Sequence, residues 1–316
     1  MAVSAAAEPR SVARAALIAL RPRQWTKNLL LFAGLLFAGK LGETSLWPEA
    51  MVAFVAYCAA SSAAYLANDV RDAQNDHDHP VKRFRPVPSG ELPVRLALGI
   101  SAVLAVGALG LAAYLGLGSL AFMAGFLALQ AAYSAGLKHV VLIDVLTISA
   151  LFVIRAGAGA EAVDVRISPW LLICTGLLAL FLALAKRRAE LVLVGAEETP
   201  GRPVLEGYSL ALVDQLVSIV AASTVIAYSL YTFTARDSKA MMATIPFVLY
   251  GVFRYLLLLH RRDLGEEPEN VLLTDVPLIL TLAAWATTSA VNVYREYAIT
   301  VEAATIETSW STSASE

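Results

Sequence analysis

The chain has 316 residues, of which 58% are apolar and 16% are charged, whereas about 25% of the residues in an ordinary globular domain carry a charge. This composition excludes a water-soluble core and leaves no room for a separate extramembrane catalytic domain. The formal net charge of −2 gives no reason to expect nucleic acid, and Cys58 and Cys174 both lie in apolar runs, so no disulfide framework is predicted.

Apolar runs of spanning length follow one another along most of the chain. A bilayer core of about 30 Å needs about 20 helical residues, and continuous apolar runs favour helices over a barrel. We predict an all-α polytopic membrane protein, a helical bundle with about nine transmembrane helices. The spans are expected at about 28–40, 47–67, 92–115, 117–135, 140–160, 169–185, 210–233, 241–260 and 274–293, the first being short unless it begins near residue 24.

Lys and Arg gather in the connections on one side of these spans. Seventeen of them, or eighteen with Arg254, fall in the N-terminal segment and the even-numbered loops, against five on the other side. Because positive residues are retained in the cytoplasm, the N-terminus is predicted inside and the C-terminus outside a plasma or inner membrane. Residues 1–20 are expected to form a cytoplasmic tail, 21–297 one transmembrane catalytic domain, and 298–316 a flexible tail.

The long inner loop after the second span begins with an unusual group of acids. Asp69, Asp72 and Asp76 are offset by three and seven residues, which places their carboxylates on one helix face if the span continues helically. Like charges there repel, and a Mg²⁺ ion shared with substrate phosphates removes the repulsion. The alternative is a solvated acidic helix cap. Zinc binding by His77 and His79 is disfavoured, because no Cys or further His lies nearby.

Basic residues follow these acids and recur in the second long inner loop. Lys82, Arg83 and Arg85 precede a Pro and Gly turn, where they suit the oxygens of a metal-bound anion, although plain cytoplasmic anchoring is the alternative. Lys186 and Arg187 open the loop after the sixth span, with the same two interpretations. The two loops lie four spans apart on the same side, which suggests a parallel repeat of helices.

A few polar residues stand inside or beside the spans. Asp144 lies near the inner end of the fifth span and is expected to line a cavity, with Lys138 just before it. Arg155 is eleven residues further on, deep toward the outer side, and a structural ion pair is expected there. Tyr133 and Trp25 lie at span ends and are most simply interpreted as anchors at the membrane–water interface.

The stretch Asn68-Asp69-x-x-Asp72-x-x-x-Asp76 resembles the first aspartate-rich motif of the UbiA superfamily of intramembrane prenyltransferases. Further segments resemble one branch of it, whose members transfer 5-phosphoribosyl from phosphoribosyl diphosphate to a polyprenyl (decaprenyl) phosphate. That product is a precursor of the arabinose donor for cell-wall arabinogalactan. The segments, within a similarity over residues 21–294, are Arg21-Pro22-Arg23-Gln24-Trp25-Thr26-Lys27-Asn28, Tyr133-Ser134-x-x-Leu137-Lys138-His139, residues 152–159 and residues 184–191.

The resemblance implies a Mg²⁺-dependent transferase with its active site toward the cytoplasm and its lipid substrate in the membrane. The metal would be held by Asn68, Asp69, Asp72 and Asp76, and catalysis would use Asp72, Asp76 and Lys186. The substrates would contact Lys27, Lys82, Arg83, Arg85, Tyr133, Lys138, Asp144, Lys186, Arg187 and Glu190.

The second long loop departs from the wider superfamily. Relatives that act on aromatic substrates have a second aspartate-rich motif where this chain has bases from Lys186 onward, which suggests less metal and more direct phosphate binding. An aromatic or haem prenyltransferase is therefore a weaker alternative. A transporter or flippase for a phosphorylated lipid is weaker still, because transport sites usually lie near the bilayer midplane. The oligomeric state, a homo-oligomer included, is left open.

Overall fold

The computed structural model describes residues 11–77, 82–197, 203–234, 239–261, 271 and 274–313, and these fold as helices and connecting turns. The α-helices are α1 (Val12–Ala19), α2 (Ala33–Phe37), α3 (Trp47–Arg71), α4 (Ala73–His77), α5 (Val94–Leu115), α6 (Leu117–Ala135), α7 (Ile143–Ala162), α8 (Pro169–Glu197), α9 (Leu210–Thr234), α10 (Ile245–Arg261) and α12 (Val276–Ser313). The 3-10 helices are η1 (Pro22–Phe32), η2 (Thr44–Leu46), η3 (Lys82–Phe84), η4 (Leu137–His139), η5 (Pro203–Gly207) and η6 (Lys239–Thr244).

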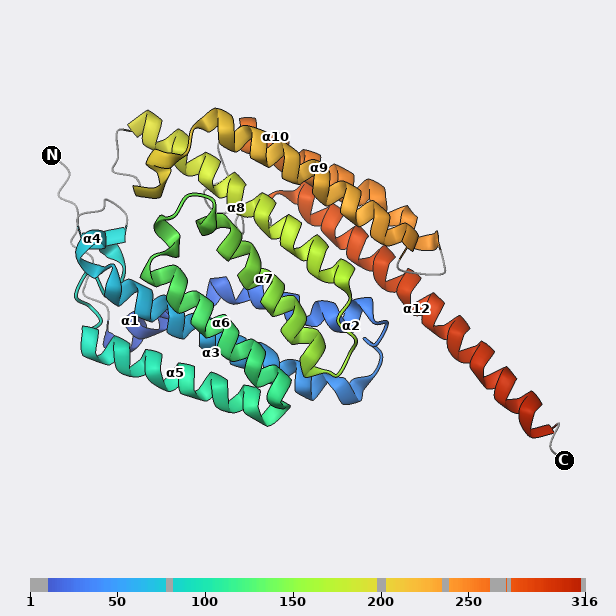
Figure 1. The fold of residues 1–316 in the computed structure, drawn as a ribbon. Coiled ribbons are helices and arrows are strands. Elements are labelled where there is room, and N and C mark those ends of the chain that lie inside the picture. Colours follow the sequence, from blue (N-terminus) through green and yellow to red (C-terminus); the bar gives the residue numbers. More distant parts are fainter. Residues whose placement is uncertain are drawn as a thin grey trace.

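The long helices form an elongated bundle. Figure 1 shows α3, α5 and α6 on one side, α8, α9, α10 and α12 on the other, and α7 between them. Within the described residues, eight helices are long and apolar enough to cross a membrane, and they correspond to the second through ninth predicted spans. The predicted all-α, multi-pass fold is therefore confirmed.

The first predicted span takes a different form. It folds as the eleven-residue 3-10 helix η1, which the five-residue α2 continues. At a rise of about 2.0 Å per 3-10 residue and about 1.5 Å per α-helical residue, the pair extends about 30 Å, the thickness of a bilayer core. This segment is thus long enough to cross without being a regular α-helix.

Backbone contact with α7 explains the irregular first segment. A Cβ atom added to Gly159 of α7 would lie 2.1 Å from the Leu31 carbonyl oxygen, and one added to Gly34 would lie 2.9 Å from the Ala160 Cα. Only glycine allows the two backbones to approach so closely, as small residues do at other membrane helix contacts. Long 3-10 helices are uncommon, so η1 depends on this packing for its conformation.

Both ends of the chain are more helical than the sequence predicts. In the expected N-terminal tail, α1 packs its buried Ala15 and Ala19 against Leu66 and Leu92 at the end of the bundle. In the expected C-terminal tail, α12 continues through Ser313. Figure 1 shows this helix extending beyond the rest of the molecule. Residues 1–10 and 314–316 lie outside the described residues, and the division into domains stays a prediction.

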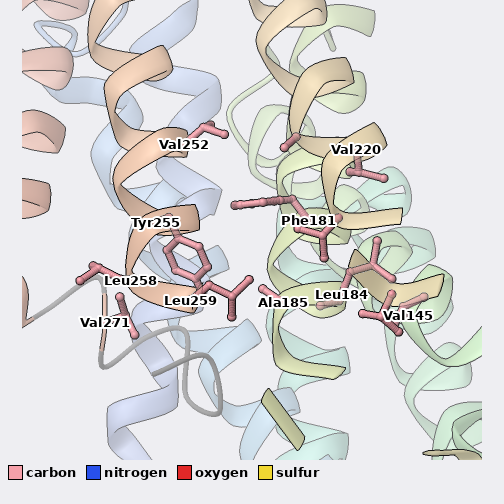
Figure 2. Close-up of a cluster of buried hydrophobic side chains, with 14 of the residues drawn as sticks. Val145, Phe181, Leu184, Ala185, Val220, Val252, Tyr255, Leu258, Leu259 and Val271 are labelled. Atoms are coloured by element: carbon pink, nitrogen blue, oxygen red, sulfur yellow. The ribbon is translucent and has the colours of Figure 1, made fainter. Parts of the chain in front are cut away.

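A cluster of buried apolar side chains joins α7, α8, α9 and α10. Figure 2 shows Phe181 of α8 and Tyr255 of α10 within it, and their ring centroids are 5.4 Å apart. Because lipid tails are as apolar as these side chains, close packing rather than transfer from water stabilises such a cluster in a membrane. The cluster fixes the middle of α8, just before Lys186 and Arg187.

Candidate active site

The last turn of α3 carries the predicted acidic motif. Asn68 and Asp69 lie on α3, Asp72 follows its last residue, and Asp76 lies on the short helix α4. The Asp76 backbone N–H donates to the Asp72 carbonyl at 2.8 Å, so the helical path continues across the junction. Figure 1 places α4 at the same end of the bundle as α1 and the C-terminal end of α8.

Asp72 forms an ion pair with a lysine from a distant loop. The Lys138 Nζ atom, on η4, lies 2.7 Å from each carboxylate oxygen of Asp72 and 3.5 Å from the Asn68 Oδ1 atom. Asn68 Nδ2 donates to Asp72 Oδ2 at 3.1 Å. Asp72 is the most accessible acid of the motif, since its side chain is 24% exposed.

Arginines form ion pairs with the other two acids, Asp69 and Asp76. Asp69 has a 1% exposed side chain, and its Oδ1 atom accepts from Arg21 at 2.5 Å and from Arg85 at 3.3 Å. Arg85 also donates to Asp76 at 2.7 Å, and Lys82 lies 3.9 Å from that carboxylate. We call this set the acidic cluster: Asn68, Asp69, Asp72 and Asp76 with Arg21, Lys82, Arg85 and Lys138.

The structure brings some of the predicted bases to the acids and not others. Lys82 and Arg85 contact acids of this cluster, whereas Arg83 is exposed and places its guanidinium 4.8 Å from the centre of the Phe84 ring. Arg21 was not among the predicted site residues. The available signal was the Arg-Pro pair before the first span, where Arg21 adopts a positive φ of 54°.

The acidic cluster fits one kind of metal site. Among the described residues, no three His, Cys, Asp or Glu side chains converge to form a cage for an ion. Asn68 and Asp72 nevertheless present hard oxygen donors around the positively charged Lys138 ammonium, a position suited to a cation. Mg²⁺ commonly takes one or two carboxylates and shares the rest of its shell with water and phosphates. The donor set therefore fits Mg²⁺ carried by a phosphorylated substrate.

A second charged group, the buried arginine cluster, consists of Asp144, Arg187, Glu190 and Tyr208. Arg187 of α8 has a 1% exposed side chain; its Nη1 atom lies 2.8 Å from Glu190, and its Nε atom lies 3.8 Å from Asp144. Neither contact has the geometry of a hydrogen bond, so these nitrogens keep unused donor capacity. Buried donors without acceptors are costly, and a water molecule or an anion would satisfy them.

Tyr208 was missed by sequence reasoning. It follows η5 in the second long loop, donates its hydroxyl to Asp144 at 2.7 Å and accepts the Leu142 backbone N–H at 2.8 Å. Burial, reinforced by the hydrogen bond to Asp144, raises the pKa of Tyr208 well above its ordinary value. Asp144 itself is fully buried and faces Tyr208 and Arg187, whereas an open cavity was expected beside it. No local motif marks a tyrosine for this role.

The short loop between α6 and α7 joins the two clusters. Lys138 on this loop reaches Asp72, and four and six residues later the same chain segment supplies Leu142 and Asp144 to the buried arginine cluster. A Cβ added to Gly207 of η5 would lie 2.4 Å from Val141, so the loop also packs directly on η5. The α6–α7 loop thus contacts both of the predicted inner loops.

Three other predicted substrate residues lie on η1, α6 and α8. Lys27 is on η1 and donates to Gln24. Tyr133 is partly buried on the last turns of α6, and Lys186 is partly buried on α8 beside Arg187. Their assignment to the substrates stays a prediction.

Arg155 does not form the expected ion pair. In the described part of the chain its partners are neutral: Nε donates to Asn28 of η1 at 2.9 Å and Nη1 to the Leu151 carbonyl at 3.1 Å. Its guanidinium also lies 4.6 Å from the Phe126 ring centre. The ion-pair expectation was wrong because a side-chain amide, a carbonyl and aromatic faces together solvate this cation. Arg155 of α7 thereby links this helix to η1 through its hydrogen bond to Asn28.

An apolar cavity of about 700 Å³ lies between η1, α2, α8, α9, α10 and α12. Its lining includes Leu30, Phe37, Phe181, Tyr228, Tyr255 and Trp285. Phe181 precedes Lys186 by five residues on α8, a rise of about 7.5 Å, so this wall of the cavity leads toward the basic end of α8. The volume and the apolar lining suit a lipid chain.

The UbiA prenyltransferase family matches residues 29–274. The chain is 34% identical over 305 residues to the decaprenyl-phosphate phosphoribosyltransferase of Mycolicibacterium smegmatis, covering 92% of this chain and 95% of that one. It is 35% identical over 288 residues to the enzyme of the same name from Mycobacterium tuberculosis, covering 89% and 94%.

Solved structures share the fold. The fold is similar to that of a UbiA homolog from Archaeoglobus fulgidus bound to DMAPP and Mg²⁺, with a TM-score of 0.69 and 18% identity over 89% of this chain and 99% of that one. The same homolog bound to GPP and Mg²⁺ gives a TM-score of 0.65, with 90% and 99% covered. At this level of identity the likeness concerns the fold alone.

Proposed function

Because the chain belongs to the UbiA prenyltransferase family, and is 34–35% identical along about nine-tenths of its length to decaprenyl-phosphate phosphoribosyltransferases, we propose that it is a transferase of that kind. It transfers 5-phosphoribosyl from phosphoribosyl diphosphate to a polyprenyl phosphate in a cell membrane and releases diphosphate. The observation that carries the proposal is this identity over nearly the whole chain. The two adjacent charged clusters support it.

The acidic cluster is proposed to receive the diphosphate end of the donor. Asn68 and Asp72 would hold Mg²⁺, which when bound neutralises charge on the departing diphosphate. Arg85 and Lys82 lie beside Asp76 in the same cluster and would contact phosphate oxygens that the ion leaves free. Asp69, buried between two arginines, would orient those bases, which is a different task from the one predicted for it.

The buried arginine cluster is proposed to bind a further phosphate group. The donor and acceptor together carry three phosphate-bearing sites, and the unused Nε and Nη1 donors of Arg187 suit one of them. Lys186 precedes Arg187 and would reach the same group. A second aspartate-rich motif, as aromatic prenyltransferases have, would place acids where these bases stand. The cluster therefore favours phosphoribosyl transfer over that alternative.

The reaction needs no base from the protein. The nucleophile is an oxygen of the lipid phosphate, a monoester largely dianionic at pH 7 because its second pKa is about 6. This oxygen bonds to ribose C1 as the bond from C1 to the diphosphate oxygen breaks, and that electron pair leaves with the diphosphate. The apolar cavity would hold part of the polyprenyl chain. The distribution of Lys and Arg supports a site that faces the cytoplasm.

The test is product formation by the purified full-length protein. It is incubated with phosphoribosyl diphosphate labelled in the ribose, a polyprenyl phosphate and Mg²⁺, and the lipid fraction is analysed. Labelled lipid is expected, and EDTA or Asp72→Ala should remove it. Glu43→Gln, which neutralises an acid that pairs with Lys40 outside both clusters, should leave it intact. No labelled lipid, or a labelled lipid that survives EDTA and Asp72→Ala, overturns the proposal.

A further inference from the structure

Lys138 occupies the oxygen-rich part of the acidic cluster. Its ammonium lies 2.7 Å from both carboxylate oxygens of Asp72 and 3.5 Å from the Asn68 oxygen. These are the same three oxygen atoms that we propose as metal donors. Since an ammonium and a divalent ion repel each other at such distances, both cannot use this position at once.

The resident charges make the acidic cluster a poor site for a bare cation. Its three carboxylates face four cations: Arg21 and Arg85 at Asp69, Arg85 and Lys82 at Asp76, and Lys138 at Asp72. The group therefore has no negative charge in excess. A divalent ion that binds without a phosphate must displace Lys138, and no excess of negative charge in the cluster stabilises it.

Lys138 is the cation best able to leave. Asp72 is 24% exposed and Lys138 12%, whereas Asp69 is 1% exposed and is held by two guanidinium groups. A lysine has a flexible four-carbon stem and a single charged atom, so it exchanges partners more readily than a forked arginine. In the described part of the chain, no acid other than Asp72 pairs with Lys138.

We propose that Lys138 is a resident counter-ion that competes with the divalent ion for Asp72 and Asn68. The metal then binds well only together with a diphosphate, whose oxygens accept the displaced ammonium. This inference rests on the proposed function, because it takes the phosphorylated donor as the carrier of the ion. Its consequence is reciprocal coupling, in which diphosphate tightens metal binding and metal tightens diphosphate binding by the same factor.

Binding of Mn²⁺ to the full-length protein, measured by electron paramagnetic resonance with and without inorganic diphosphate, tests the idea. For the wild type, saturation of the site with diphosphate should lower the Kd of Mn²⁺ at least about tenfold, after correction for Mn²⁺ bound by free diphosphate. Lys138→Met should lower the Kd of Mn²⁺ alone at least about tenfold, because the competing charge is gone, and should lower turnover at the same time. A structural role for Lys138 predicts the opposite sign, weaker metal binding.

Matched variants separate competition from general charge effects. Lys82→Met removes an ammonium that lies 3.9 Å from Asp76 rather than at the 2.7 Å of the Lys138–Asp72 contact, and should change the Mn²⁺ affinity much less. Lys138→Arg keeps the charge and should keep Mn²⁺ binding weak, and Asp72→Asn added to Lys138→Met should cancel the gain. Lys138→Gln is measured in parallel in case the Met variant does not fold.

The outcomes distinguish this inference from the proposed function. If neither Lys138→Met nor Lys138→Gln, when folded, tightens Mn²⁺ binding, Lys138 is not a competitor and the inference is overturned. An equal gain in Lys82→Met also overturns it, because the effect would then be one of net charge. If the expected Mn²⁺ pattern is found but the wild type makes no labelled lipid, the exchange stands and the proposed reaction fails.

Discussion

The acidic cluster and the buried arginine cluster lie on either side of the α6–α7 loop, yet they accommodate charge differently. In the acidic cluster each carboxylate has a base within 2.7 Å, and Asp72 remains 24% exposed. In the buried arginine cluster Asp144 and Arg187 are almost completely enclosed, and Arg187 contacts both Asp144 and Glu190 without forming a hydrogen bond through Nε or Nη1. Exposed pairs exchange partners easily, whereas buried charges are costly to uncouple. We infer that the first cluster admits and releases groups, and that the second is preorganised.

The largest effect is expected from uncoupling the buried pair. Arg187→Met leaves the Asp144 carboxylate in a dry site and should lower the free energy of unfolding by about 3–5 kcal/mol. Thermal melting in detergent, followed by loss of the monodisperse peak, measures the change. The double variant Asp144→Asn with Arg187→Met removes this pair of charges and leaves only the partly exposed Glu190 without its arginine, so it should recover part of the stability. Equal melting temperatures for the wild type and Arg187→Met would contradict the preorganised role.

Asp72→Asn should separate activity from stability. The substitution keeps the shape and removes the charge of a partly exposed acid, so kcat/KM should fall at least about a hundredfold, the scale seen when one transition-state contact is lost. The melting temperature should change by only a few degrees, because exposed pairs contribute little. A similar loss of melting temperature in Asp72→Asn and Arg187→Met would remove the distinction between the two clusters.

Gly159→Ala tests whether η1 must rest on α7 to complete the acidic cluster through Arg21. The added methyl would lie 2.1 Å from the Leu31 carbonyl and must push η1 away, at a cost of about 1–3 kcal/mol. Hydrogen exchange should rise within residues 22–32. Gly125→Ala on α6 is the matched control, because a Cβ there meets no atom within 4 Å. If both variants behave alike, the close contact is not what positions η1.

Tyr208→Phe should have the smallest effect and should act on the buried arginine cluster alone. It removes one hydroxyl that bonds both Leu142 and Asp144, so a loss of about 1–2 kcal/mol is expected in thermal melting. Because the pKa of Tyr208 is raised on folding, its stabilising contribution is complete below the ordinary tyrosine pKa and disappears only as the pH rises through the raised value. The difference from the wild type should therefore be constant between about pH 6 and pH 9. A difference that vanishes in that range would show that the hydroxyl ionises there.

Hydropathy predicted the long helices well and the first segment poorly. Eight spans are regular helices because each satisfies its own backbone, a local requirement that an apolar run reveals. The 3-10 form of η1 depends on Gly159 and Gly34 of two different segments, and no window of sequence contains both. The helical α1 likewise depends on a contact with Leu66 and Leu92.

Part of the candidate site could likewise be predicted from local sequence, and part could not. The spacing of Asp69, Asp72 and Asp76 placed three acids together, and positive residues close to them in sequence, Lys82 and Arg85, were found with them. Arg21, 48 residues from Asp69, and Tyr208, 64 residues from Asp144, could not be assigned in this way. Lys138 was named as a substrate residue, but its bond to Asp72 was not foreseen.

By itself the sequence determined that this protein is a bundle of membrane helices with its charges concentrated at one end, because apolar length and charge position are local properties of a chain. It also determined which acids lie together, because they share a helix face. Only the tertiary structure decided which base faces which acid, which charges stay accessible and which are enclosed, because these depend on contacts between helices distant in sequence. The exchangeable Lys138–Asp72 pair and the enclosed Arg187–Asp144 pair are both results of that packing.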